Sequence, residues 1–135
     1  MTEEWVEFEL VSPERLLFSE NVEMVVVPGG AGDFGVLPRH APMISTVRPG
    51  VIRVYEKGQV KERIFVAGGF AEVTPARCTV LADRALPVAE IDRAAAEQQL
   101  ADAREDLADA TTEAERKMAE KMIAVAEAML QAGES

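Results

Sequence analysis

Between Trp5 and about Asp83, apolar residues occur in short runs that alternate with polar residues. Val6, Phe8 and Leu10, for example, alternate with glutamates. A period of two places successive side chains on opposite faces of a β-strand, and many short strands close their edges best as a sandwich or barrel. The pattern therefore predicts an all-β domain. Its runs are residues 6–10, 22–26, 44–47, 51–55, 60–66, 69–73 and 78–82, with tight turns expected at 49–50 and 57–59.

After Pro87 the pattern becomes helical. No Gly or Pro occurs before Gly133, alanine dominates, and charges recur at spacings of three and four. Residues 110–112 interrupt the run, and Thr112 with Glu115 fits a capping box, in which a hydroxyl and a carboxylate satisfy free backbone N–H groups. The sequence thus predicts two domains, residues 1–86 and 87–135, the second an antiparallel hairpin of helices 91–108 and 113–131.

Each predicted helix has one apolar face. The face of the first helix is rich in alanine and would allow close approach of the two helices. The free energy gained by burying such small faces barely exceeds the entropic cost of ordering the helices. We therefore expect the hairpin to need contact with the sandwich or a partner for stability, and to be able to detach and extend. The expected faces are Ile91, Ala95 or Ala96, Leu100, Ala103 and Leu107, and Met118, Met122, Val125 and Met129, widened by Ile123, Ala126 and Leu130.

The formal net charge of −10 opposes direct binding to nucleic acid or to an anionic membrane surface, and favours protein partners or cations. Residues 87–135 carry 12 acidic and 5 basic side chains, against 12 and 9 in residues 1–86. No apolar stretch reaches the roughly 18 residues that a membrane span needs, and the acidic start of the chain is unlike a targeting peptide. We expect a soluble protein of the cytoplasm.

The single cysteine, Cys78, cannot form an internal disulfide, and its place in a predicted strand indicates a small core residue. His40, the only histidine, excludes a multi-histidine metal site and lies between Pro38 and Pro42. Packing or hydrogen bonding in a loop is favoured for it, and a partner contact is the alternative. No serine has a nucleophile-elbow context, so no enzyme mechanism can be assigned.

Residues 30–35 read Gly-Ala-Gly-Asp-Phe-Gly and match the G-x-G-x-x-G pattern of dinucleotide sites. Such a site needs a helix whose N-terminus faces the pyrophosphate, whereas Pro38 and Pro42 follow here and Asp33 would repel phosphate. We interpret the segment instead as a glycine-rich connection that exposes Asp33 and Phe34 to a partner.

Four blocks resemble the epsilon subunit of the F-type ATP synthase in order and spacing, and with the hairpin the resemblance covers essentially the whole sequence. The family fold implied is a ten-stranded β-sandwich followed by a two-helix hairpin. The blocks are residues 36–42 (Val-Leu-Pro-Arg-His-Ala-Pro), 48–50 (Arg-Pro-Gly), 67–73 (Ala-Gly-Gly-Phe-Ala-Glu-Val) and 79–83 (Thr-Val-Leu-Ala-Asp).

The resemblance also implies a non-catalytic rotor subunit that binds the gamma subunit and the polar loops of the c-ring, and that associates with the membrane only through the complex. The acidic c-ring contact of the family falls on Asp33, with His40 at the same edge of the sandwich, and the approach to gamma falls on Ser12. A bacterial member would lie on the cytoplasmic face of the inner membrane, and its c subunits would set proton or sodium as the coupling ion.

In many bacterial members the hairpin extends into the catalytic head of alpha and beta subunits and blocks ATP hydrolysis. Here Arg116, Lys117 and Lys121 would meet the acidic segment of the beta subunit. The ATP-sensing motif of some members corresponds to Ile91 and Asp92, but Ala95 replaces its arginine, so we expect no ATP ligand and no cofactor. A free regulatory module that binds ATP or a cation is the rival hypothesis, and an independent enzyme is the third.

Overall fold

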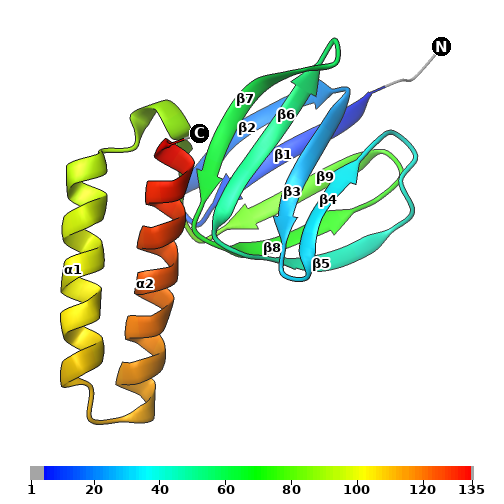
Figure 1. Cartoon of the computed structure of the whole chain (residues 1–135). Helices are drawn as coiled ribbons and strands as arrows, with labels where there is room; N and C mark the ends of the chain where they lie inside the picture. The colour runs from blue at the N-terminus through cyan, green and yellow to red at the C-terminus, as the bar shows by residue number, and fades with distance from the viewer. Residues whose placement is uncertain (1–4, 135) are drawn as a thin grey trace. The chain divides into compact units, whose positions relative to one another are not determined.

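The computed structural model describes residues 5–134 of the 135-residue protein, without the side chain of Arg15. The chain divides into two compact units, Met1–Pro87 and Val88–Ser135, which are described separately (Figure 1). Ten strands followed by two helices confirm the predicted fold class. The strands are β1 (Val6–Ser12), β2 (Arg15–Val22), β3 (Met24–Gly29), β4 (Gly32–Val36), β5 (Met43–Val47), β6 (Gly50–Glu56), β7 (Gln59–Val66), β8 (Gly69–Val73), β9 (Arg77–Ala82) and β10 (Ala85–Pro87).

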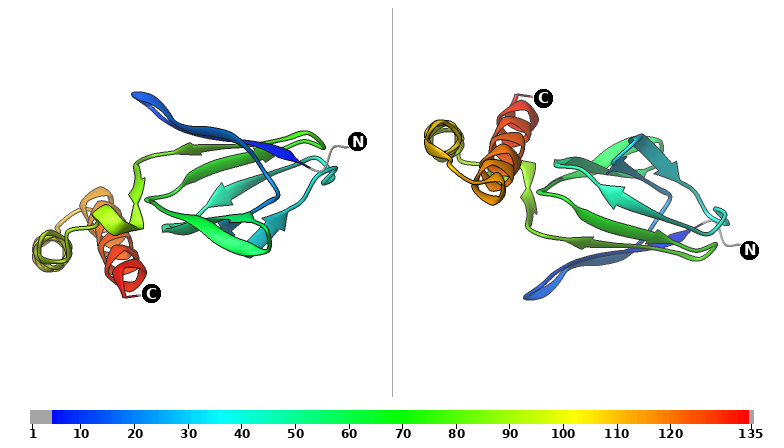
Figure 2. Two further views of the ribbon diagram at one scale, coloured as in Figure 1. Left: turned by 90° about the horizontal axis from the view of Figure 1, so that it is seen from above. Right: turned by 90° about the horizontal axis from the view of Figure 1, so that it is seen from below.

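The strands form one continuous sheet that folds over into two layers, which Figure 2 shows from above and below. The strand order is β10-β7-β6-β3-β5-β8-β9-β1-β2, with β4 paired to β3 off this path. A single bridge, Gly29 to Val47, joins β3 to β5 and marks the fold between the layers. All pairs are antiparallel except β1 with β9.

The core lies between the two layers. Inward residues of the alternating strands fill it, as the period of two predicts, and Phe8 packs its ring 5.5 Å from that of Phe18. Cys78 is fully buried, as expected from its position in a strand. The largest buried side chains in this cluster are Phe8, Leu10, Ile52, Val6, Val25, Val27, Val36, Val54, Val66, Val73 and Val80.

Two strand predictions were wrong in detail. The apolar run 22–26 is two strands, because β2 ends at Val22 and β3 begins at Met24, with the N–H of Glu23 bonded to Tyr55 O at 3.3 Å. The glycine-rich segment 30–35 is largely strand β4, which pairs with β3 and leaves no helix for a dinucleotide. Phe34, expected to be exposed, packs against the core because its β4 position faces inward.

The two predicted turns differ. Lys57 and Gly58 have φ values of 56° and 75° and close the β6–β7 hairpin, as predicted. Arg48 and Pro49, by contrast, connect β5 to β6, and these strands are not paired with each other, since β3 lies between them in the sheet. This segment therefore leads from one layer to the other and is not a hairpin turn.

The second unit consists of a short 3-10 turn, η1 (Val88–Glu90), and the helices α1 (Arg93–Asp109) and α2 (Glu113–Gly133). Helix α1 starts two residues later than predicted, because Asp92 caps it: its carboxylate accepts the N–H of Ala95 at 3.2 Å. The predicted capping box of α2 is present, with Thr112 and Glu115 bonded to each other's backbone N–H groups.

Small residues dominate the buried faces of the helices. Ala96 and Ala103 are buried on α1, so Ala96 and not Ala95 belongs to the face, as one of the two predicted alternatives had it. On α2, Met118 is 62% exposed, which contradicts the prediction that it lies on the buried stripe. The buried line instead runs through Ala119, Val125, Ala126, Met129 and Ala132, because alanines permit the closest approach of two helices.

Candidate functional site

A row of apolar side chains crosses the outer face of the layer formed by β5, β8, β9, β1 and β2. Phe70 on β8 is opposite Leu81 on β9, Leu81 is opposite Val11 on β1, and Val11 is opposite Leu16 on β2. Phe70, Leu81 and Leu16 are 54% to 57% exposed. Ile44 on β5 is 76% exposed and is opposite Glu72 of β8, so it lies diagonal to Phe70. We call these five residues the apolar row. Contiguous exposed apolar side chains of this kind mark protein interfaces.

Ser12 lies at one end of the apolar row, next to Val11 at the end of β1. It precedes the turn of the β1–β2 hairpin, which extends away from the other strands in Figure 2. Ser12 also lines a shallow groove of about 380 Å³ with Glu14, Leu17 and Arg84 among its other walls. The backbone of the residue expected to approach the gamma subunit therefore borders the apolar row, while its side chain is directed to the opposite face of the strand.

Asp33 is the second residue of β4, and its carboxylate is held by two arginines. Arg48 donates to Oδ1 at 2.5 Å, and Arg53 lies 3.6 Å from Oδ2. The side chain of Asp33 remains 49% exposed, so it keeps lone pairs available to a partner. Its charge, however, is paired within the sandwich.

Backbone contacts hold the glycine-rich hairpin that precedes Asp33. Gly30 N–H donates to Thr46 O at 2.9 Å, and Arg48 N–H donates to Pro28 O at 2.9 Å. The Arg48 guanidinium also donates to Gly29 O at 2.5 Å. These bonds join the β3–β4 turn to the β5–β6 connection, so the loop is fixed in place before any partner binds.

His40 lies in the connection between β4 and β5, where it is half-buried. Its Nδ1 donates to Ala41 O at 2.7 Å, and its backbone N–H donates to Leu37 O at 3.2 Å. Asp33 is close to the start of β4, and His40 follows its end, so the roughly 10 Å of strand from Asp33 to Val36 lies between them along the chain. Asp33 and His40 are thus carried by opposite ends of β4.

The residues of the expected ATP motif lie at the start of α1. Ile91 is half-buried and its N–H donates to Val88 O at 3.1 Å, while Asp92 serves as the N-cap. Ala95 is exposed and offers no side-chain donor. Arg93 is paired with Glu97 at 3.2 Å and with Glu134 at 3.4 Å. Within residues 5–134, no group of three or more His, Cys, Asp or Glu side chains could hold a metal ion.

The basic residues of α2 lie in its first turns, as predicted, and are all exposed. Arg116 forms a long ion pair with Glu113, with 3.8 Å between Nε and Oε1. Lys117 and Lys121 are four residues apart and therefore share one face of the helix. Acidic residues surround this small cluster in the sequence.

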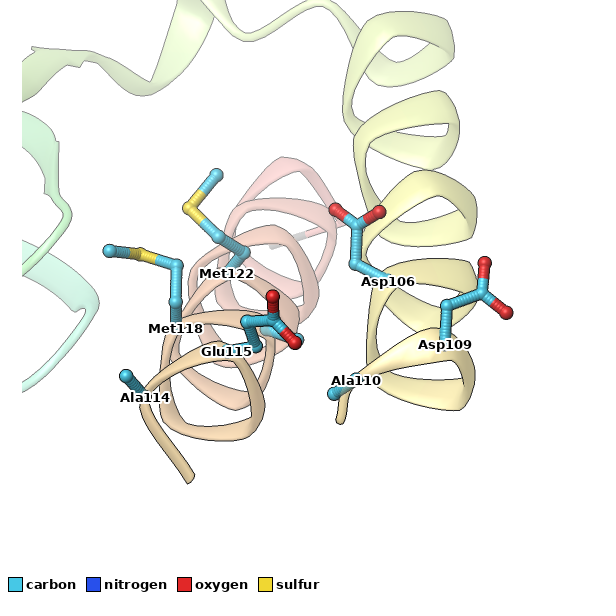
Figure 3. Close-up of a pocket in the computed structure, with 8 residues that line it drawn as sticks. Asp106, Asp109, Ala110, Ala114, Glu115, Met118 and Met122 are labelled. Atoms are coloured by element: carbon cyan, nitrogen blue, oxygen red, sulfur yellow. The ribbon is translucent and has the colours of Figure 1, made fainter. Parts of the chain in front are cut away.

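An open groove of about 460 Å³ lies at the end of the hairpin where α1 passes into α2 (Figure 3). Asp106 and Asp109 line it from α1, and the side chains of Met118 and Met122 come from α2. Hydrogen bonds from the backbone and then the hydroxyl of Thr111 lower the pKa of Glu115, which also lines the groove. The groove is thus acidic on its rim, and Arg116, Lys117 and Lys121 are not among its lining residues.

Sequence reasoning missed the apolar row and the partners of Asp33. Leu16 and Phe70 were visible as apolar residues, but strand register decides that Val11 and Leu81 join them across an outer face, with Ile44 diagonal to Phe70. Arg48 was recognised only as part of a sequence block, and Arg53 was not singled out. The sequence could have identified Arg53 as a surface residue of interest, because it interrupts the apolar run 51–55 at an outward position.

Family models match both units of the protein. The model described as the ATP synthase delta/epsilon chain, beta-sandwich domain, matches residues 6–88, and that of the C-terminal domain of the ATP synthase epsilon chain matches residues 92–135. The protein is also 62% identical to an ATP synthase epsilon chain of Rhodospirillum rubrum over 129 residues, which is 96% of each chain. An epsilon chain of Paramagnetospirillum magneticum is 53% identical over 129 residues, covering 96% of this chain and 97% of that one.

Solved structures agree with this assignment. A chain of the Euglena gracilis mitochondrial ATP synthase, in a structure of OSCP, F1 and c-ring, has a TM-score of 0.81 and 26% identity, with 96% of this chain and 82% of that one covered. A chain of the Tetrahymena thermophila central stalk and c-ring shares the fold, with a TM-score of 0.72, 13% identity, and coverage of 95% and 96%. The protein described here therefore belongs to the ATP synthase epsilon chain family.

Proposed function

We propose that this chain is a non-catalytic rotor subunit that binds the gamma subunit and the polar loops of the c-ring, and so couples ion-driven rotation of the ring to ATP synthesis in the catalytic head. The observation that carries the proposal is the apolar row, because a monomer has no use for four apolar side chains joined across neighbouring strands on an outer face, with the exposed Ile44 diagonal to Phe70. The protein would then reach the cytoplasmic face of a bacterial inner membrane only as part of the complex. None of the helices in residues 5–134 is long and apolar enough to cross a membrane.

The gamma subunit is the proposed partner of the apolar row. Burial of a half-exposed Leu, Ile or Phe contributes about 1 kcal/mol, so the row supports a permanent contact when it acts as one surface. Ser12 adds backbone polar groups at the edge of the row, where polar rims are normal. Proton or sodium flow would then turn this subunit and gamma as one body.

The polar loops of the c-ring are the proposed partner of the sandwich edge that carries Asp33, and His40, beyond the other end of β4, is proposed as a separate contact with them. Asp33 retains exposed oxygen atoms that accept hydrogen bonds from loop groups. Because Arg48 and the backbone fix the β3–β4 turn, this contact would need little ordering on binding.

Co-purification with gamma tests the proposal. We expect the double variant Phe70→Ser and Leu81→Ser to lose gamma, while the matched double variant Leu37→Ser and Val60→Ser, which changes exposed apolar residues outside the row, keeps it. Both doubles should unfold at wild-type temperature, since only exposed side chains change. A wild-type protein that dissociates from gamma during purification would favour the rival hypothesis of a free regulatory module.

The hairpin is proposed as an inhibitory arm that meets the alpha and beta subunits. Two observations support this role: the hairpin is a compact unit separate from the sandwich, and Lys117 is exposed. Truncation after Pro87 should raise ATP hydrolysis by the catalytic head bound to gamma severalfold. Replacement of Arg116, Lys117 and Lys121 by Gln in the full-length protein should also raise ATP hydrolysis if these charges make the contact. Unchanged hydrolysis in both variants would mean that the protein has a coupling role and that the hairpin does not inhibit.

ATP is not proposed as a ligand of the hairpin. Asp92 is used as a helix cap, Arg93 is paired, and Ala95 has no donor for phosphate. Calorimetry with the full-length protein should detect no ATP binding, and the variant Ala95→Arg should gain affinity if the rest of the motif is competent. Binding of ATP by the wild-type protein would contradict this part of the proposal.

A further inference from the structure

Three arginines gather on the outer face of the other layer of the sandwich. Arg53 on β6 is directly opposite Arg63 on β7 in the antiparallel register. On its other side Arg53 is opposite Val26 of β3, which is in turn opposite Gly35 of β4, two residues from Asp33. Arg48 reaches the same carboxylate from the connection that precedes β6. We call Arg48, Arg53, Arg63 and Asp33 the arginine face.

Positive charge on this face exceeds what its own carboxylate balances. Asp33 pairs with Arg48 and Arg53, and among the described residues no carboxylate lies within salt-bridge distance of Arg63. Like charges directly opposite one another on neighbouring strands destabilise a sheet. This local excess of positive charge occurs in a protein whose net charge is −10.

The three arginines are held to different degrees and are all accessible. The guanidinium of Arg48 is fixed by Gly29 O and Asp33, that of Arg53 lies 3.6 Å from Asp33, and that of Arg63 is placed by the strand register opposite Arg53. The side chains of Arg48 and Arg53 are 45% and 39% exposed, and Arg63 is exposed. A guanidinium has five N–H donors, so each keeps donors that none of the described residues of the sandwich uses. The face can therefore receive hydrogen-bond acceptors, and Arg48 and Asp33 fix its edge.

We propose that the arginine face binds a carboxylate on a polar protein loop, with Arg53 and Arg63 as its main contacts. The inference rests on the proposed function, because Asp33 places the face next to the expected contact with the c-ring loops. Arginine pairs recognise planar carboxylates through two parallel N–H···O bonds, and a loop can offer a donor to Asp33 at the same time. A polyanionic surface has no such donor, and Asp33 would repel its phosphates. The contact with the c-ring is thus made by donors of this protein to acceptors of the loop as well as by Asp33.

Binding of the complex of gamma and the full-length protein to purified c-ring in detergent, measured at several salt concentrations, tests the inference. The double variant Arg53→Gln and Arg63→Gln should bind about tenfold or more weakly, with a shallower dependence on salt. The matched double variant Lys57→Gln and Arg104→Gln removes two exposed basic residues outside the face, one in the β6–β7 turn and one on α1, and should bind as the wild type does.

The experiment distinguishes failure of the proposed function from failure of this inference. If the wild-type complex does not bind the c-ring, the proposed function and this inference are both overturned. If the wild type binds and the arginine double variant keeps its affinity, the inference alone is overturned. Sedimentation with vesicles of equal parts phosphatidylglycerol and phosphatidylcholine covers the alternative partner: binding that Arg53→Gln and Arg63→Gln abolish, with c-ring affinity unchanged, would assign the face to lipid headgroups instead.

Stability of the free protein provides an independent readout. Because Arg63 opposes Arg53 and has no carboxylate within salt-bridge distance among the described residues, Arg63→Gln should leave the melting temperature of the free protein unchanged or raise it, while it weakens c-ring binding. A lower melting temperature together with weaker binding would indicate that Arg63 stabilises the fold, and would count against a binding role.

Discussion

Lys61 of β7 places its Nζ 3.0 Å from Oε1 of Glu20 on β2, a residue of the opposite layer of the sandwich. The same ammonium lies 3.0 Å from Glu56 at the end of β6. One lysine therefore bridges strands that lie far apart in the sheet order, away from the single bridge between β3 and β5. This ion pair helps to close the two layers.

Lys61→Met should lower the melting temperature of the protein in a pH-dependent way. The hydrogen bonds from Lys61 to Glu20 and then to Glu56 raise the pKa of its ammonium in the folded state. The stabilisation is therefore complete below the unfolded pKa of about 10.5 and is lost as the pH rises through the higher folded pKa. Calorimetric melting temperatures of wild type and variant should differ at about pH 8 and converge at strongly alkaline pH. The control Lys57→Met, in the neighbouring turn, should not show a difference in melting temperature that is present at about pH 8 and disappears at alkaline pH.

Gly69→Ala should strongly destabilise the sandwich. Gly69 has a φ of +145°, and an added Cβ would overlap the backbone oxygen of Leu81, which the β8–β9 ladder holds in place. We expect a loss of about 3 kcal/mol or more in the free energy of unfolding, measured by urea titration. Gly58→Asn is the control, since its φ of +75° suits asparagine and nothing lies within 4 Å of the added atom. Equal stability of the two variants would contradict the close approach of β8 and β9.

Ala103→Leu should loosen the helical hairpin. Ala103 is 3% exposed on the face of α1 that contains Ala96, and the added atoms would have to force the helices apart. Overpacking of this kind lowers stability by about 1–3 kcal/mol. Hydrogen exchange of α1 and α2 amides should become faster in the full-length protein. Ala101→Leu, at an exposed position of the same helix, should leave the exchange unchanged, and equal effects of the two would rule out close packing at Ala103.

Cys78 should resist thiol reagents as long as the sandwich is folded. Burial raises the pKa of its thiol to about 12, so almost no thiolate forms at mildly alkaline pH. The side chain is also fully buried between the layers, which denies access to a reagent. Labelling by a chromogenic disulfide at about pH 8 should therefore follow the rate of unfolding and become rapid in denaturant. Rapid labelling of the folded protein would show that β9 opens locally.

The sequence by itself determined the class of each unit. Strand and helix periods depend only on residues near one another in the chain, and they correctly separated an all-β unit from a helical hairpin. The Thr112 and Glu115 capping box was predictable for the same reason, because its bonds span three residues. The burial of Cys78 followed from its place in an alternating run.

Tertiary structure decided which residues meet across the sheet. Strand β4 was not predicted, because a segment of glycines has a low propensity for strands. Pairing with β3 and the core contact of Phe34 make it a strand instead. Exposure of Met118 was likewise decided by tertiary packing, because its side chain points away from α1 (Figure 3). The apolar row and the arginine face likewise join residues from different strands, and only the register places Leu81 beside Val11 and Arg53 beside Arg63. A pattern along one strand fixes which face a side chain occupies, whereas its neighbours on that face are set by the pairing of strands.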